Sequence, residues 1–319
     1  MIDNKFVPKK NKKFVCFYHS PCFDGLVAAW LLHTKFDENI SFIPANYTVL
    51  PNLHSKECDD ASGIIFLDYS PNKNIIDQAL KCKKLVSIID HHPQTKNLFD
   101  RESNSLKIYY DCTKSGASLV WSLFFNKDIP DFIQLIEDID LNKIPPRNLP
   151  EQRNKYFQAA AFIDSHDLNA PLEVAENWIS KAILLSLDEL AKEGKYYRAE
   201  LLNKIKETIK YFDRIHISNQ PLVLVKADIE ELGHEFFPIL IETTHIDIAA
   251  AWHVCSDHVR INIRSHSNSS VIEVRDTLIK NYSGNGGGHA HASVVRLTYN
   301  QFHKFCADYK LGNSNGMKI

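Results

Sequence analysis

The chain has 319 residues, 44% of them hydrophobic, enough for one large domain or, as we expect, two of ordinary size with separate cores. Its 37 lysines and arginines nearly balance its 39 aspartates and glutamates, and the net charge of −2 excludes a protein that coats long nucleic acid through a broad basic surface. A polyanionic substrate is therefore expected to be small or held at one place.

The cysteines and the hydropathy pattern favour a cytoplasmic protein without a membrane partner. The seven cysteines are odd in number, scattered and free of CxxC pairs, so neither a disulfide framework nor a structural zinc site is indicated. No apolar run approaches the roughly 18 residues of a membrane span, and the lysine-rich opening lacks a signal-peptide core. We expect a solvated tail at residues 1–13 and a flexible tail at residues 311–319.

In the first third of the chain, short β-rich runs alternate with helical stretches. This alternation predicts a parallel sheet with helices on both faces. The expected strands are FVCFYH (14–19), SFIPANY (41–47), GIIFLDYS (63–70), LVSIID (85–90) and LKIYYD (106–111), with helices from Gly25 and near Ile75.

The middle of the chain is helical, and a second β-rich section follows it. Between residues 115 and 217, apolar residues recur at helical spacing, as in SGASLVWSLFF and PDFIQLIEDI. Trp121 in this section and Trp30 earlier in the chain lie within apolar helices, and we expect both in the core. A turn-like SNQP then introduces PLVLVKAD, IDIAAAWHVC, VRINIRS and SVVRLTYN, with a helix over 271–282. The boundary falls near residue 216, giving a first domain at 14–216 and a smaller mixed α/β domain at 217–310.

Acidic and histidine side chains follow three of the expected strands of the first domain. Carboxyl ends of parallel strands meet at one edge of the sheet, where ligands of open α/β sheets bind. Carboxylate and imidazole together suit Mn²⁺, Fe²⁺ or Mg²⁺, and two such ions roughly 4 Å apart act on phosphoryl groups. His19, Cys22 and Asp24 come at or after the end of FVCFYH, and Asp68 follows GIIFL. Asp90, His91 and His92 come at or after the end of LVSIID.

Structural explanations compete with this interpretation to different degrees. A lone Asp such as Asp68 at a strand end is often only the N-cap of the next helix. Two adjacent imidazoles at His91 and His92 have no special value as caps, so the Asp-His-His tripeptide favours chemistry. The SGAS segment at Ser115 resembles a helix start whose N-terminus faces phosphate, but capping explains it equally well.

LVSIIDHHPQ resembles the signature of the DHH phosphoesterases, which include manganese pyrophosphatases, RecJ-type exonucleases, oligoribonucleases and cyclic-dinucleotide phosphodiesterases. HSPCFDG is similar to the first family motif, IIFLDYSP to the second, and LIEDIDL to the fourth. The fourth motif offers Asp138 or Asp140, both after the same apolar helix, and we favour Asp138. The resemblance implies that one ion is held by Asp24, Asp68, His91 and Asp138, and that the other is held by His19 and the bridging Asp68. It also implies that His92 meets the phosphate or orients the site. Asp90 would act behind the ligands, in contact with them and not with the ions.

One position departs from the family pattern. Cys22 stands two residues before Asp24, where the family has the first Asp of a D-x-D pair. Either Cys22 ligates as a thiolate, or the first ion is held weakly through His19, Asp68 and water, or the enzyme works with one ion, or activity is lost. A reactive free cysteine without a metal role is a further alternative. We expect activity to be retained.

The glycine run SGNGGGHAHAS predicts a second binding element. Successive glycines let the backbone approach an anion before a helix, and VRINIRS ends in a phosphate-binding pair. These segments resemble the DHH-associated carboxyl-terminal domain, so the resemblance spans nearly the whole chain. It implies that substrate is bound by Arg264, Ser265, Gly286, Gly287, Gly288 and His289. We assign no function to His166, Asp167 or His291, the last of which is as readily a helix residue.

The sequence therefore predicts a manganese-dependent phosphoesterase with one or two ions, Mg²⁺ or another divalent ion serving instead. We expect its site to lie in the cleft between the domains and its substrate to be a short oligonucleotide or small nucleotide. We also expect the homodimer that is common in the family. An exopolyphosphatase or nucleoside bisphosphate phosphatase is the enzymatic alternative. A non-catalytic nucleotide- or nucleic-acid-binding protein with a decayed metal site is the alternative from another class.

Overall fold

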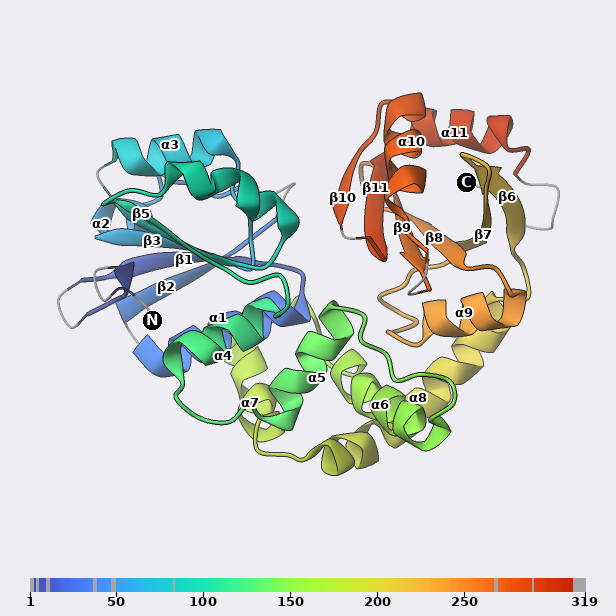
Figure 1. Ribbon diagram of the computed structural model, residues 1–319, viewed down its shortest axis with the longest axis horizontal. Helices are drawn as coiled ribbons and strands as arrows, with labels where there is room; N and C mark the ends of the chain where they lie inside the picture. Colours follow the sequence, from blue (N-terminus) through green and yellow to red (C-terminus); the bar gives the residue numbers. More distant parts are fainter. Residues whose placement is uncertain are drawn as a thin grey trace. The chain divides into compact units, whose positions relative to one another are not determined.

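The computed structural model describes residues 3, 6–9, 12–36, 39–46, 50–82, 84–266, 269–288 and 290–311 (Figure 1). It divides into two compact units: Met1–Ala159 with Ser165–Glu193, and Ala160–Asp164 with Gly194–Ile319. The division falls inside a long helix, α8 (Leu187–Thr208), rather than near the residue 216 expected from the sequence. No helix of the described part of the chain is long and apolar enough to cross a membrane.

The first unit contains the predicted parallel sheet. Its strand order is β2-β1-β3-β4-β5, and every neighbouring pair is parallel. The order reverses between β1 and β3, which is the point where open α/β sheets bind ligands. The strands are β1 (Phe14–His19), β2 (Ile40–Ala45), β3 (Gly63–Leu67), β4 (Leu85–Asp90) and β5 (Leu106–Tyr110).

Helices cover both faces of this sheet, as predicted (Figure 1). The residues of β3 are buried throughout because both faces of a parallel sheet are covered. On one face α1 (Phe23–Phe36) packs against α4 (Gly116–Phe124), and Trp30 and Trp121 are buried there as expected. The other face is covered by α3 (Lys73–Lys81) and the 3-10 helix η3 (Pro93–Arg101). The remaining helices of the first unit are α2 (Lys56–Asp60), α5 (Asp131–Asp140) and α7 (Leu172–Ala182), and α6 (Pro150–Asp164) ends in the second unit.

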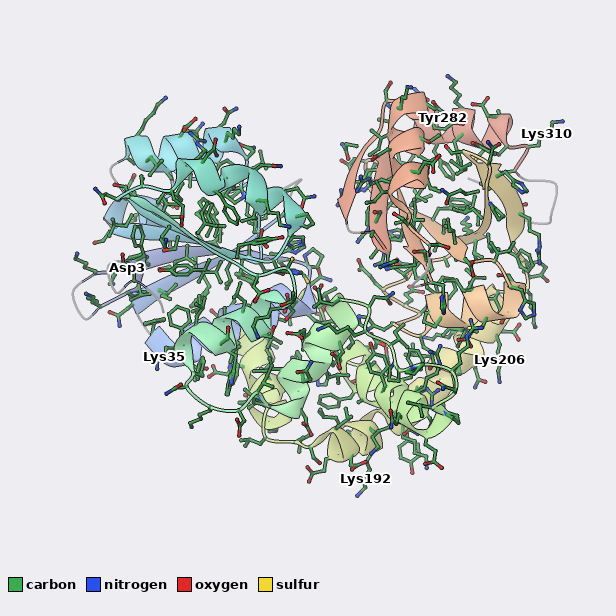
Figure 2. The ribbon with its side chains drawn as sticks, in the orientation of Figure 1. Asp3, Lys35, Lys192, Lys206, Tyr282 and Lys310 are labelled. Carbon is green, nitrogen blue, oxygen red and sulfur yellow. The ribbon has the colours of Figure 1, made fainter. Side chains whose placement is uncertain are left out.

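Of the described residues in the expected solvated tail at 1–13, Asp3, Lys9, Lys12 and Lys13 are exposed, but residues 6–8 are buried. Phe6 and Val7 are 3% and 7% exposed, because these two apolar side chains pack against the sheet. The Ser87 hydroxyl donates to the carbonyl oxygen of Phe6 at 2.8 Å, and the backbone N–H of Asp3, labelled in Figure 2, donates to the Tyr109 hydroxyl. The flexible tail expected at 311–319 lies, except for residue 311, outside the described residues.

The second unit contains a mixed sheet in the order β10-β11-β9-β8-β7-β6, in which only β7 and β8 pair in parallel. The turn between β6 and β7 places Ser218 and Asn219 at positive φ, as a tight hairpin requires. Helix α9 (Phe236–Thr244), which the sequence did not predict, packs on one face, and α10 (Ile272–Tyr282) and α11 (Tyr299–Asp308) pack on the other. The strands are β6 (Asp213–Ile217), β7 (Gln220–Lys226), β8 (Ile248–Val254), β9 (Val259–Ser265), β10 (Asn285–Gly288) and β11 (Ala292–Leu297), so this sheet begins before the expected start at residue 217.

Candidate metal centre

Carboxylates and imidazoles gather at the carboxyl edge of the first sheet, where the sequence placed them. His19 ends β1, Asp68 follows β3, and the Asp-His-His segment begins at the last residue of β4. Asp24 comes from the first turn of α1 and Asp140 from the last residue of α5. The parallel strands thus bring side chains from five separate segments together.

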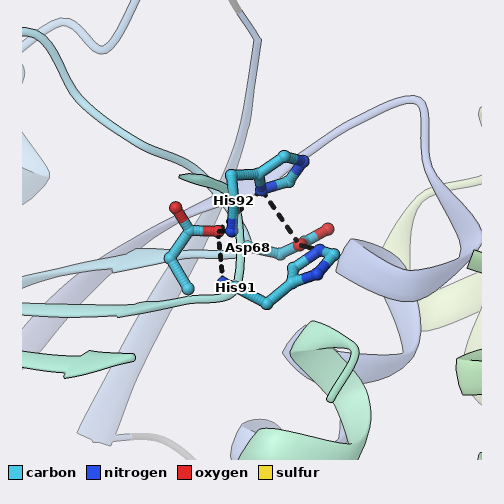
Figure 3. Close-up of side chains that lie close together, drawn as sticks. Asp68, His91 and His92 are labelled. Atoms are coloured by element: carbon cyan, nitrogen blue, oxygen red, sulfur yellow. Dashed lines mark hydrogen bonds and ion pairs between the residues drawn. The ribbon is translucent and has the colours of Figure 1, made fainter. Parts of the chain in front are cut away.

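Asp68 lies beside His91 and His92 (Figure 3). Its side chain is 1% exposed, with Oδ1 3.1 Å from His91 Nε2 and Oδ2 3.5 Å from His19 Nδ1. Within the described residues, neither carboxylate oxygen has a hydrogen bond of normal geometry. Its backbone adopts φ 51°, a left-handed conformation that is costly away from glycine and typical of functional sites.

The two oxygens of Asp68 face two different groups of candidate ligands. In one group, ligand atoms of His19, Cys22 and Asp68 lie within 4.8 Å of one another, and in the other those of Asp24, His91 and Asp140 do so. Burial opposes ionisation of Asp68, but the imidazoles of His19 and His91 outweigh it and lower the pKa of Asp68. An ionised buried carboxylate with one oxygen toward each group could serve as a ligand for a divalent cation on either side.

Asp24 is held by the N-terminus of α4. Its Oδ2 accepts from the backbone N–H of Gly116 at 2.5 Å, and its Oδ1 accepts from that of Ala117 at 2.8 Å. The helix start at SGAS therefore faces a carboxylate of the protein itself, while Ser115 and Ser118 form a capping box. Burial, together with the negative charges of Asp68 and Asp140, raises the pKa of Asp24 well above its ordinary value. A cation between these carboxylates would relieve that repulsion, so the residues fit a divalent ion.

The choice of Asp138 over Asp140 is corrected by the structure. Asp140 Oδ2 lies 3.4 Å from His91 Nε2, whereas Asp138 Oδ1 accepts a hydrogen bond from Gln134 at 2.9 Å within its own helix. The buried Oδ2 of Asp140, like the oxygens of Asp68, has no hydrogen bond within the described residues. Asp140 thus takes the place expected for Asp138.

Asp90 is fully buried and accepts hydrogen bonds with both oxygens. Its Oδ1 accepts from the backbone N–H groups of His91 and His92, and His92 Nδ1 lies 2.7 Å from the same oxygen. Its Oδ2 accepts from the hydroxyls of Ser70 and Thr95, neither of which the sequence singled out. With both oxygens so engaged, Asp90 is placed to orient the histidines from behind. Its ligand atom and those of Asp68, His91 and His92 also lie within 4.8 Å of one another.

Both histidines of the Asp-His-His segment favour the charged form. Burial lowers the pKa of His92, but Asp90 outweighs it and raises that pKa to about 9. Burial also opposes charge on His91, where Asp140 and Asp68 raise the pKa well above its ordinary value. The His92 side chain is 15% exposed against 1% for His91, so His92 is the one nearer to solvent.

Cys22 lies in the loop between β1 and α1 and belongs to the same group as His19 and Asp68. Removal from water and the negative charge of Asp68 raise the pKa of its thiol well above the usual value. A thiolate at this position therefore needs a neighbouring cation. None of the seven cysteines, all of which lie in the described part of the chain, forms a disulfide.

The glycine segment of the second unit is not a loop that precedes a helix. Residues 285–288 form the edge strand β10, which pairs with β11. A Cβ on Gly286 would lie 2.2 Å from the Val294 carbonyl oxygen, and Gly288 has φ 130°, so this close pairing requires glycine there. Gly287 has open space where a Cβ would be, and His289 lies outside the described residues.

Arg264 and Ser265, which the sequence predicts as a phosphate-binding pair, have different surroundings in the structure. The guanidinium of Arg264 lies over the ring of Phe237 at 5.5 Å and donates to the Ile263 carbonyl oxygen. The hydroxyl of Ser265 is buried and donates to the Ser269 carbonyl oxygen, beside His291 Nδ1 at 3.3 Å. Ser265 therefore stabilises its loop instead of facing a ligand, and His291 belongs to that loop and not to a helix.

No family model matches the chain. An uncharacterised protein of Acanthamoeba polyphaga mimivirus is 26% identical over 224 residues, 62% of this chain and 52% of that protein, so the chain spans about half the length of the curated relative it matches.

Three solved structures are similar to the chain over most of its length. They are a pGpG-specific phosphodiesterase, PggH, of Vibrio cholerae (TM-score 0.45, 18% identity, 94% of this chain and 97% of that one), CDC45 of Entamoeba histolytica (0.48, 9%, 93% and 94%) and an exopolyphosphatase-related protein of Bacteroides fragilis (0.48, 14%, 94% and 93%). At these scores and identities, we base the functional proposal on the residues of the site.

Proposed function

We propose that the chain is a divalent-metal-dependent phosphoesterase of the DHH kind that hydrolyses phosphodiester bonds of short oligonucleotides or small nucleotides. The observation that supports it most is the buried Asp68 carboxylate, which faces His19 on one side and His91 on the other. A decayed site would not be expected to keep two ligand groups around one ionised carboxylate.

Divalent ions in such a site supply Lewis acidity to the phosphoryl group and acidify water. We assign their binding to two groups, His19 with Cys22 and Asp68, and Asp24 with His91 and Asp140. The second group, which Asp68 Oδ1 approaches through His91, suits Mn²⁺ or Mg²⁺. Asp90 holds the proton on Nδ1 of His92, and a charged His92 would donate to a phosphoryl oxygen and stabilise negative charge there.

Arg264, in the second unit, is a residue that we propose to bind a phosphate group of the substrate, as the family resemblance implies. Its guanidinium lies over the ring of Phe237, and a planar guanidinium recognises phosphate through two parallel N–H groups. Gly286, Gly287, Gly288 and His289 remain proposed substrate residues through the family resemblance. A homodimer and a cytoplasmic location also remain predictions.

The proposal is tested by Mn²⁺-dependent hydrolysis of di- to pentanucleotides, cyclic dinucleotides, adenosine bisphosphate and polyphosphate. We expect wild type to cleave the short nucleotides, His91→Ala to lose that activity, and the exposed His54→Ala to keep it. Preferential cleavage of polyphosphate would move the assignment to an exopolyphosphatase. Tight oligonucleotide binding by metal-loaded wild type without turnover of any substrate would instead identify a binding protein.

A further inference from the structure

The loop between β1 and α1 holds a sulfur ligand in a fixed position. A Cβ on Gly25 would lie 2.2 Å from the carbonyl oxygen of His19, so the loop packs tightly against the end of β1. Cys22 lies in this loop, three residues after His19 and three before Gly25. The ligand atoms of His19, Cys22 and Asp68 lie within 4.8 Å of one another, a spacing that one cation can span.

A second observation indicates that a ligand belongs at this place. Asp68 Oδ2 is buried, is directed toward His19 at 3.5 Å, and has no hydrogen bond within the described residues. Buried polar atoms are normally satisfied, so a buried carboxylate oxygen of this kind is suited to bind a cation.

The two groups around Asp68 offer different chemistry. Asp24, His91 and Asp140 provide two carboxylates and an imidazole, whereas the other group provides one imidazole, one sulfur and one carboxylate. Thiolate ligands select Zn²⁺, Co²⁺ or Fe²⁺ over Mn²⁺ and Mg²⁺. Three protein ligands with an open fourth position are also the usual arrangement of a catalytic zinc ion.

We propose that His19, Cys22 and Asp68 form a thiophilic half-site, which binds Zn²⁺ or a similar soft divalent ion beside an oxygen-rich half-site suited to Mn²⁺. The Cys22 thiol gives up its proton to solvent as the sulfur–metal bond forms, so charge and atoms balance. This inference concerns the metal centre of the proposed function, but it is tested by binding and does not require turnover.

Co²⁺ reports the sulfur ligand directly, because a thiolate bound to Co²⁺ gives a near-ultraviolet charge-transfer band. Chelator-treated full-length protein is titrated with Co²⁺, and bound metal is counted by elemental analysis. We expect the band in wild type and in Cys82→Ser, whose cysteine is exposed and outside both ligand groups, and its loss in Cys22→Ser. Circular dichroism checks that each variant is folded.

Cys22→Asp gives a second, independent readout. Replacing sulfur by a carboxylate should lower the ratio of Zn²⁺ affinity to Mn²⁺ affinity by about tenfold or more. Substitutions around a bound metal commonly change metal affinity by about that factor. Co²⁺-loaded wild type without the band, or an unchanged Zn²⁺ to Mn²⁺ ratio in Cys22→Asp, would overturn the inference. If such a protein still hydrolyses nucleotides, the proposed function stands and only the role of Cys22 fails. If no divalent ion binds, both proposals fail.

Discussion

The carboxylate of Asp24 accepts a hydrogen bond from the backbone N–H of Gly116, 92 residues away in the sequence, at 2.5 Å. This bond joins the first turn of α1 to the N-terminus of α4 and fixes one face of the candidate metal centre. A Cβ on Gly116 would lie 2.8 Å from Asp68 Cβ and 3.0 Å from Asp24 Oδ2. The site therefore has no room for a side chain at this position.

Gly116→Ala should push Asp24 and Asp68 apart and lower divalent-metal affinity by about 10- to 100-fold, with a parallel loss of hydrolysis. Isothermal titration with Mn²⁺ measures the affinity. Gly287→Ala is the matched control, because its Cβ would meet nothing within 4 Å, and its metal affinity should equal that of wild type. Unchanged affinity in Gly116→Ala would show that the site tolerates a side chain there.

Asp140→Asn and Asp138→Asn form a matched pair on one helix. Asp140 faces His91, so its neutralisation should reduce metal affinity by about tenfold or more. Among the described residues, Asp138 accepts from Gln134 in its own helix and does not face His91, so its neutralisation should leave affinity within about twofold. Metal titration of the two variants decides between them, and a larger loss in Asp138→Asn would restore the original expectation.

Thr95→Val should destabilise the protein by about 1.5–3 kcal/mol, because it removes a donor from the buried, ionised Asp90. Urea unfolding of the metal-free protein measures the loss. Thr208→Val removes a hydroxyl bound to a carbonyl oxygen on the surface of α8 and should change stability much less. Equal losses in the two variants would show that Asp90 does not depend on Thr95.

Stability of the metal-free protein should fall as pH rises from about 6.5 toward 9. The folded pKa of His92 is raised to about 9 from an ordinary 6.5, so its contribution is fully present below pH 6.5 and is lost as pH passes the folded value. The contribution is at most about 3 kcal/mol. His92→Gln should flatten this dependence in urea unfolding between pH 6 and 9. His91 adds a change of the same sign, and an unaltered slope in the variant would contradict the role of His92.

The local sequence was sufficient for the parallel sheet and for most residues of its edge. Continuous apolar runs such as GIIFL and LVSII are typical of strands buried on both faces, and alternation with helices makes them parallel. Once the strands are parallel, the side chains at their carboxyl ends must meet. His19, Asp68 and His91 were therefore placed together without any knowledge of contacts.

The second domain was predicted less well, because its signals are ambiguous. A run of glycines permits a loop, a turn or an edge strand, and only the pairing of β10 with β11 selects the strand. Ser265 ends an apolar strand, where a phosphate-binding residue is expected, but its hydroxyl donates to the carbonyl oxygen of Ser269. The same holds for Phe6 and Val7, whose burial depends on the sheet beside them.

The sequence by itself determined the sheet, the order of its elements and the identity of nearly every candidate ligand. The tertiary structure alone decided between Asp138 and Asp140: two residues apart on a helix, they point in directions roughly 200° apart, and the packing of α5 against α4 sets which one meets His91. It also decided that Asp24 lies on the N-terminus of α4 and that Asp68 lies between two ligand groups, because hydrogen bonds and close approaches between distant segments leave no periodic trace in a sequence.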